Sequence, residues 1–128
     1  MKQIVSLLCA VLALSACEKD DANTIKIGSV LPMTGSNASV GAAVKAGIET
    51  AVDDKNKTDL KYTYKVIFED GQGAPAKSIS AAQKLISADS AKVLISSTTA
   101  VGRAIGPIAE NSNLLNLNAT LEKEDTDL

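Results

Sequence analysis

The chain has 128 residues, with 13 basic and 15 acidic side chains, a formal net charge of −2, and neither histidine nor tryptophan. This length suits one modest domain, and charges spread along the chain without a basic cluster argue against nucleic-acid binding. The lack of histidine removes the usual general base and the commonest metal ligand. We therefore expect no metal, no other cofactor and no catalytic residue.

The first residues have the pattern of an export signal. Lys2 provides a positive charge, residues 4–14 form an almost unbroken apolar run, and small residues precede Cys17. Such a run is typical of a secretory signal and is too short for a membrane-spanning helix, which needs about 20 apolar residues. Residues 14–17, Leu-Ser-Ala-Cys, resemble the lipobox of bacterial lipoproteins, which implies cleavage after residue 16 and lipid attachment to Cys17. The alternative is an ordinary signal peptide with an incidental cysteine.

Processing at this point predicts three segments: a lipoprotein signal peptide over residues 1–16, a tether over 17–24, and a domain over 25–128. The tether is polar and carries four charges, and removal of the signal takes away Lys2 and Cys9. The mature chain then keeps a single cysteine, so it forms no intramolecular disulfide. We expect an exported protein, in the periplasm or at the cell surface, anchored to a bacterial membrane by acyl chains.

Four short apolar runs are predicted to be strands, over residues 25–31, 62–68, 92–95 and 114–117. Three amphipathic helices are predicted between them. The first has Ser39 as its N-cap and ends at residues 53–56, and the second has Pro75 in its first turn. The third covers residues 100–110, where Pro107 predicts a kink or a break.

Strictly alternating strands and helices predict an α/β fold, a parallel sheet with helices on both faces and right-handed crossovers. In such sheets ligands bind at the carboxyl ends of the strands. The segments at these ends are residues 32–40, 69–75, 96–99 and 118–120.

Two of these strand ends are rich in hydroxyl and amide groups. Residues 96–99 are Ser-Ser-Thr-Thr before a helix, and residues 118–120 are Asn-Ala-Thr. Backbone N–H groups at a helix N-terminus, with a hydroxyl beside them, suit an anion such as a carboxylate. A small zwitterion would fit donors and acceptors of this kind. The alternative is that Thr98 or Thr99 merely caps the following helix.

Other motifs predict less. The stretch from Gly35 to Gly41 lacks the Lys-Ser/Thr of a phosphate-binding loop and does not have the dinucleotide-binding spacing. Glu69 and Asp70 at a strand end form a possible metal or acid–base pair, but solvated loop carboxylates are the expected reading. Asp70 is also suited to bind the backbone N–H groups of its own turn.

Several segments, in order, resemble the periplasmic Leu/Ile/Val-binding proteins. They are IKIGSVLPMTG at residues 25–35, FEDGQGAPAK at 68–77, VLI at 93–95, PIAE at 107–110 and LNAT at 117–120. The resemblance covers essentially the whole chain after residue 25. It implies a type 1 solute-binding protein in lipoprotein form, of which this chain is part of the N-terminal lobe, with two lobes that close over a ligand.

The resemblance also implies roles for individual residues. Thr99 corresponds to the serine that binds the ligand carboxylate, and Thr120 to the threonine that contacts carboxylate and ammonium. Asn118 corresponds to a residue whose backbone carbonyl accepts from the ammonium. Ser97 and Thr98 fall on the loop beside the ligand. Val40 stands where related proteins often place an aromatic, and Ser96 and Ser97 occupy the stretch where the family usually has a glycine.

The partners implied are a small-molecule ligand, either an amino acid or a similar zwitterion, and the permease subunits of an ABC transporter. The family's second lobe supplies an acidic partner for the ammonium group, so we expect this chain to be a fragment of a longer product. Two alternatives use the same lobe, a ligand sensor without transport and a lipoprotein with a structural or partner-binding role. An enzyme is not expected, because histidine and a nucleophile motif are both absent.

Overall fold

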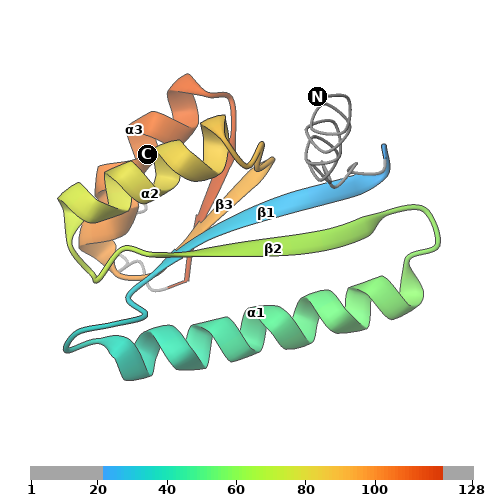
Figure 1. The fold of residues 1–128 in the computed structure, drawn as a ribbon, viewed down its shortest axis with the longest axis horizontal. Coiled ribbons are helices and arrows are strands. Elements are labelled where there is room, and N and C mark those ends of the chain that lie inside the picture. The colour runs from blue at the N-terminus through green and yellow to red at the C-terminus, as the bar shows by residue number, and fades with distance from the viewer. Residues whose placement is uncertain (1–21, 120–128) are drawn as a thin grey trace, which may run out of the picture.

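The computed structural model describes residues 22–119, which form one parallel sheet and three helices (Figure 1). The strands are β1 (Thr24–Leu31), β2 (Thr63–Asp70), β3 (Val93–Ser96) and β4 (Leu115–Asn118), in the spatial order β2-β1-β3-β4. All three pairings are parallel. The predicted α/β fold is therefore confirmed. The predictions for Cys17, Thr120 and the signal peptide lie outside the described residues.

The helices are α1 (Ala38–Thr58), α2 (Pro75–Ser87) and α3 (Thr99–Asn111). Figure 1 shows α1 on one face of the sheet and α2 with α3 on the other. Right-handed crossovers require this arrangement, because the chain moves from β1 to β2 in one direction and from β2 to β3 and β4 in the other.

The buried core lies between the sheet and the α2–α3 layer. Fully buried side chains come from both sides of it: Val30, Leu85, Leu94, Val101 and Ile105. Gly28 of β1 faces this layer, and a Cβ atom there would lie 3.0 Å from atoms of Leu85 and Leu94. The absence of a side chain lets α2 pack close to the sheet, which removes the apolar faces of both elements from water.

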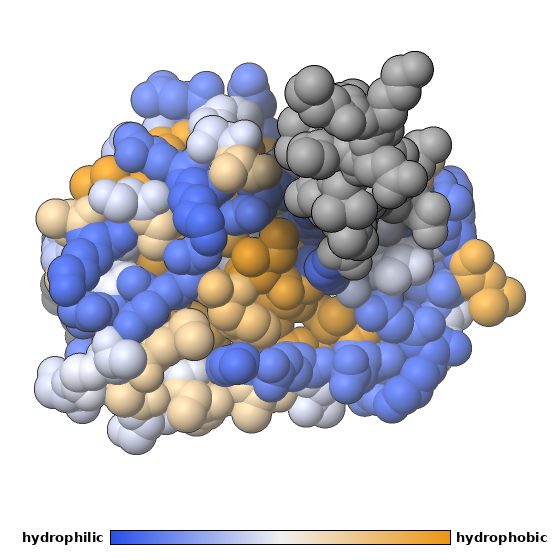
Figure 2. Space-filling view, viewed as in Figure 1, coloured by the Kyte–Doolittle hydropathy of each residue, from blue (hydrophilic) through white to orange (hydrophobic). Residues whose placement is uncertain are grey.

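The opposite face, under α1, is more open. Only Gly41 of α1 is fully buried, and the predicted apolar stripe is half-buried at Val44, Ile48 and Val52. A hollow beneath the helix is lined by Ile27, Ile48, Ala51, Val52, Lys55, Tyr64 and Ile95. On β4, Leu115 and Leu117 are 58% and 49% exposed. Figure 2 shows apolar surface exposed between α1 and the α2–α3 layer.

Several predicted boundaries are wrong by a few residues. Helix α1 begins at Ala38 with Asn37 at the cap position, so Ser39 is not its N-cap, and the helix continues to Thr58. Strand β1 begins at Thr24, the last residue of the predicted tether. Pro75 is confirmed in the first turn of α2.

Helix α3 runs without a break through Pro107. Pro107 lacks the N–H that would donate to the carbonyl of Arg103 in an uninterrupted helix, and both residues are exposed. Because this part of the helix surface is exposed, the missing N–H costs less here than it would in a buried helix, and the helix continues through Pro107.

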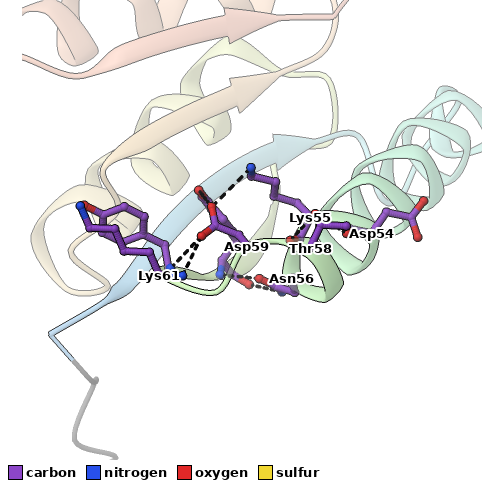
Figure 3. Close-up of polar contacts among 8 residues, drawn as sticks. Asp54, Lys55, Asn56, Thr58, Asp59 and Lys61 are labelled. Carbon is purple, nitrogen blue, oxygen red and sulfur yellow. Dashed lines mark hydrogen bonds and ion pairs between the residues drawn. The ribbon is translucent and has the colours of Figure 1, made fainter.

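A polar cluster joins the end of α1 to β2 (Figure 3). The Asp59 carboxylate accepts from the backbone N–H groups of Lys61 (2.9 Å) and Tyr62 (3.1 Å) and from the Tyr64 hydroxyl (2.9 Å). Asn56 pairs with the backbone of Tyr64, accepting from its N–H at 2.7 Å and donating to its carbonyl at 2.9 Å. The amide side chain thus mimics a strand neighbour at the start of β2.

We expect the Asp59 contacts to make stability depend on acid pH. The backbone N–H groups of Lys61 and Tyr62, then the Tyr64 hydroxyl, hold the pKa of Asp59 well below its usual value. A carboxylate with a depressed folded-state pKa stabilises above its unfolded pKa of about 3.9, and this stabilisation is lost as the pH falls through the folded value. Asp59→Asn should therefore lower the Tm at pH 7. The difference from wild type should shrink as thermal unfolding is measured at progressively lower pH below about 4, and a constant difference would contradict the prediction.

Two glycines of α1 provide a matched test of the helix-to-loop contact. A Cβ atom at Gly41 would lie 2.2 Å from the carbonyl oxygen of Pro32, whereas a Cβ atom at Gly47 would have no neighbouring atom within 4 Å. Gly41→Ala should reduce the free energy of unfolding by about 1–3 kcal/mol, because the helix must move away from the loop. Gly47→Ala should increase it by about 0.5–1 kcal/mol through helix propensity. Urea unfolding of both variants distinguishes these effects, and equal shifts would show that the contact has no influence.

Candidate ligand-binding site

The order of the strands places a switch point between β1 and β3. After β1 the chain leaves toward α1 on one face, and after the neighbouring strand β3 it leaves toward α3 on the other. The loop over residues 32–37 and the turn at residues 97–98 therefore diverge at one edge of the sheet. In open α/β sheets this divergence is where ligands bind.

The turn between β3 and α3 is short and strained. Thr98 has φ 74° and ψ 136°, a conformation that a β-branched residue rarely adopts and that costs about 1–3 kcal/mol. It directly follows Ser96 and Ser97, which occupy the stretch where the family usually has a glycine. This backbone conformation leads the chain directly from the end of β3 into the first turn of α3.

The side chain of Asn118, at the end of β4, holds this turn. Its amide nitrogen donates to the carbonyl of Thr98 at 2.9 Å and to the hydroxyl of Ser96 at 3.2 Å. The N–H of Gly102 donates to the same Thr98 carbonyl at 3.0 Å. Gly102 must lack a side chain, because a Cβ atom there would lie 2.0 Å from the Asn118 amide nitrogen. The sequence predicted a role for the Asn118 backbone only, and nothing in the pattern indicated its side-chain contact with Thr98.

The N-terminus of α3 has the features of an anion site. Thr99 is the first residue of this 13-residue helix and is half-buried, and the first turn contains no acidic residue. Thr98 holds the cap position but makes no side-chain capping hydrogen bond, so the simple capping alternative is wrong for Thr98. The positive end of the helix dipole thus faces the edge where the two loops diverge.

The other predicted site residues are placed as follows. Val40 lies in the first turn of α1 and is 42% exposed. Ser97 is fully buried, and its hydroxyl is without a hydrogen-bond partner among residues 22–119. Its expected place on the loop beside the ligand stays a prediction. Thr120 lies beyond the described part of the chain, so its position beside Thr99 stays a prediction.

On the other side of the switch point, Asp70 holds the loop after β1. Its carboxylate accepts from the N–H of Met33 (2.9 Å) and the hydroxyl of Thr34 (2.5 Å), and also from the N–H of Gln72 (2.9 Å). The predicted bond within its own turn is confirmed by Gln72. The contacts with the loop after β1 could not be read from the sequence, because they join residues about 37 positions apart.

Two absences hold for residues 22–119. This part of the chain contains no cluster of three or more carboxylate, cysteine or histidine side chains placed to hold a metal ion. Among its helices, each is too short or too polar to cross a membrane.

Comparison with known proteins places the chain in a family. The model of the family described as "Periplasmic binding protein" matches residues 24–127. A Leu/Ile/Val-binding protein of Rhizobium johnstonii is 31% identical over 98% of this chain and 34% of its own length. A Leu/Ile/Val-binding protein homolog of Brucella melitensis is 33% identical over 79% of this chain and 28% of its own length.

Solved structures share the fold. A leucine-binding protein of Thermotoga maritima is similar with a TM-score of 0.68, at 28% identity over 73% of this chain and 27% of that one. A solute-binding protein of an ABC transporter from Rhodopseudomonas palustris, in complex with 3,4-dihydroxybenzoic acid, has a TM-score of 0.69 at 26% identity, over 75% and 27% of the two chains.

The fold and the matched residues define a solute-binding lobe of the periplasmic type. The chain belongs to the periplasmic binding protein family and resembles its Leu/Ile/Val-binding members. It spans about a third of the length of the curated relatives it matches, and it corresponds to part of their N-terminal lobe.

The strain at Thr98 predicts an unusual response to glycine. Thr98→Gly should increase the free energy of unfolding by about 1 kcal/mol, because glycine adopts a positive φ without steric cost. Thr98→Ala is the matched control, since alanine keeps the Cβ atom and therefore most of the strain. Urea unfolding of the two variants is the measurement. A stability for Thr98→Gly at or below that of Thr98→Ala would show that the turn is not strained.

Proposed function

We propose that the chain is the N-terminal part of a substrate-binding lipoprotein of an ABC transporter. It would bind a branched-chain amino acid or a related small carboxylate between two lobes and present it to the permease subunits. Lipid attachment at Cys17 and an exported location on a bacterial membrane are parts of this proposal. The protein would bind its ligand without chemical change, as a solute-binding protein and not an enzyme.

The observation that supports this function most is the N-terminus of α3 at the switch point between β1 and β3. A helix of 13 residues without an acidic residue in its first turn favours a negatively charged group there. The relatives' names point to the same chemistry: leucine, isoleucine, valine and 3,4-dihydroxybenzoic acid all carry a carboxylate. The carboxylate is therefore the group we assign to this end of the sheet.

The proposed roles follow from these placements. Thr99, through its hydroxyl and backbone N–H, and Thr120, through its hydroxyl, bind the carboxylate. The backbone carbonyl of Asn118 accepts from an ammonium group, and Val40 forms part of the apolar wall. Ser97 and Thr98 contribute through the shape and backbone of the turn, since the Ser97 side chain is buried.

A titration of the complete two-lobed protein tests the function. Isothermal calorimetry against leucine, isoleucine, valine and 3,4-dihydroxybenzoate should show binding to wild type, and Thr99→Ala together with Thr120→Ala should abolish it. Each lost bond to a charged group costs about 1.5–3 kcal/mol, so the pair weakens binding by more than about 100-fold. Thr99→Ser is the control and should retain most of the affinity, because serine keeps the hydroxyl.

The residues 17–128 alone should bind weakly or not at all, since closure between two lobes is missing. Unchanged affinity in the double variant would contradict the site assignment. Failure of wild type to bind any carboxylate ligand would contradict the function, and would favour a structural or partner-binding lipoprotein.

A further inference from the structure

Asp70 is the acidic residue at the carboxyl end of β2, directly beside the end of β1. The parallel register places it opposite Leu31, the last residue of β1. Its Oδ1 atom accepts from the backbone N–H groups of Met33 at 2.9 Å and Thr34 at 3.4 Å, and its Oδ2 atom accepts from the Thr34 hydroxyl at 2.5 Å. One carboxylate thus binds three donors of the loop after β1.

The carboxylate is itself held in a rigid turn. The N–H of Gln72 donates to Oδ1 at 2.9 Å, and the N–H of Gly71 donates to the carbonyl of Leu31 at 2.9 Å. Gly71 cannot carry a side chain, because a Cβ atom would lie 2.4 Å from the Ser78 hydroxyl oxygen. The turn after β2 and the loop after β1 are therefore fixed to each other at two points.

The neighbouring lysines bond to other side chains than Asp70. Lys84 pairs with Glu69, and Lys77 donates to the side chain of Gln72. Chiefly the Thr34 hydroxyl, and then the N–H groups of Gln72 and Met33, hold the pKa of Asp70 below its usual value against the opposing effect of burial. The carboxylate consequently stays ionised at neutral pH, in the form that accepts all of these hydrogen bonds.

We infer that Asp70 is a positioning residue of the ligand site, which holds the loop over residues 32–37 at the switch point. It does on the β1 side what the Asn118 side chain does on the β3 side. In each case an outer strand of the sheet supplies the side chain that fixes the loop of the inner strand next to it. The effect on ligand affinity rests on the proposed function, whereas the effect on the loop does not.

The first experiment measures amide hydrogen exchange by NMR in wild type, Asp70→Asn and Thr34→Val. Asp70→Asn replaces the charged acceptor, so the amides of Met33 and Gln72 should exchange about tenfold faster or more, while those of Leu94 and Ile105 in the core stay unchanged. Thr34→Val removes the hydroxyl donor alone and should give a smaller increase at the same amides. Asn118→Ala should accelerate exchange around Gly102 and leave Met33 as in wild type.

Asp53→Asn on the exposed side of α1 is the matched control, because it changes the same charge away from the loop. Its exchange pattern should equal that of wild type. Unchanged exchange at Met33 in both Asp70→Asn and Thr34→Val would overturn the inference. If Asp70→Asn does not fold, Thr34→Val decides the question by itself.

The second experiment measures the affinity of the complete protein for the best ligand of the calorimetric panel. Asp70→Asn should weaken binding about tenfold, since a loop that is no longer preorganised must be ordered on binding. Asp53→Asn should bind as wild type does. Wild-type affinity in Asp70→Asn would overturn the inference and leave the proposed function intact. If wild type binds no ligand, the proposed function fails, and exchange at Met33 still decides whether Asp70 holds the loop.

Discussion

The handedness of the crossovers is the constraint on which the rest of this structure depends. A right-handed connection from β1 to β2 puts α1 on one face of the sheet, and the connections that lead to β3 and β4 put α2 and α3 on the other. Neighbouring strands β1 and β3 must then send their chains in opposite directions. The edge where they separate is, for that topological reason, the place where open α/β sheets bind ligands, before any side chain is considered.

Loops that diverge in this way cannot hold each other, so the outer strands hold them. Asp70 at the end of β2 binds Met33 and Thr34, and Asn118 at the end of β4 binds the carbonyl of Thr98. In both contacts a side chain at the end of an outer strand bonds to the backbone of the loop that follows the neighbouring inner strand. The strain of Thr98 persists because the surrounding structure over-determines its conformation, as is common where a site needs a fixed shape.

The sheet is more completely buried on its α2–α3 face than on its α1 face. Against α2 and α3, small residues such as Gly28 and Gly102 bring the layers into contact and bury the core. Under α1, Ile48 and Val52 line a hollow, and Leu117 remains half exposed. Among the described residues, most of the buried apolar contacts therefore lie between the sheet and the α2–α3 layer. Helix α1 is attached near its two ends, where Gly41 contacts Pro32 and Asn56 bonds to β2.

Local pattern by itself determined the order of the elements, their parallel arrangement and the loops that follow the strands at the carboxyl edge of the sheet. This succeeded because apolar periodicity and crossover handedness are local or general properties of the chain. The prediction of Ser39 as the helix cap was wrong, because the start of a helix depends on the backbone conformation of one or two residues, which the sequence pattern does not specify. Only the tertiary structure decided that Asp70 and the Asn118 side chain hold the loops, and that Ser97 is buried. Those facts depend on atoms brought together across 20 or more residues, whose contacts form only when the strands pair.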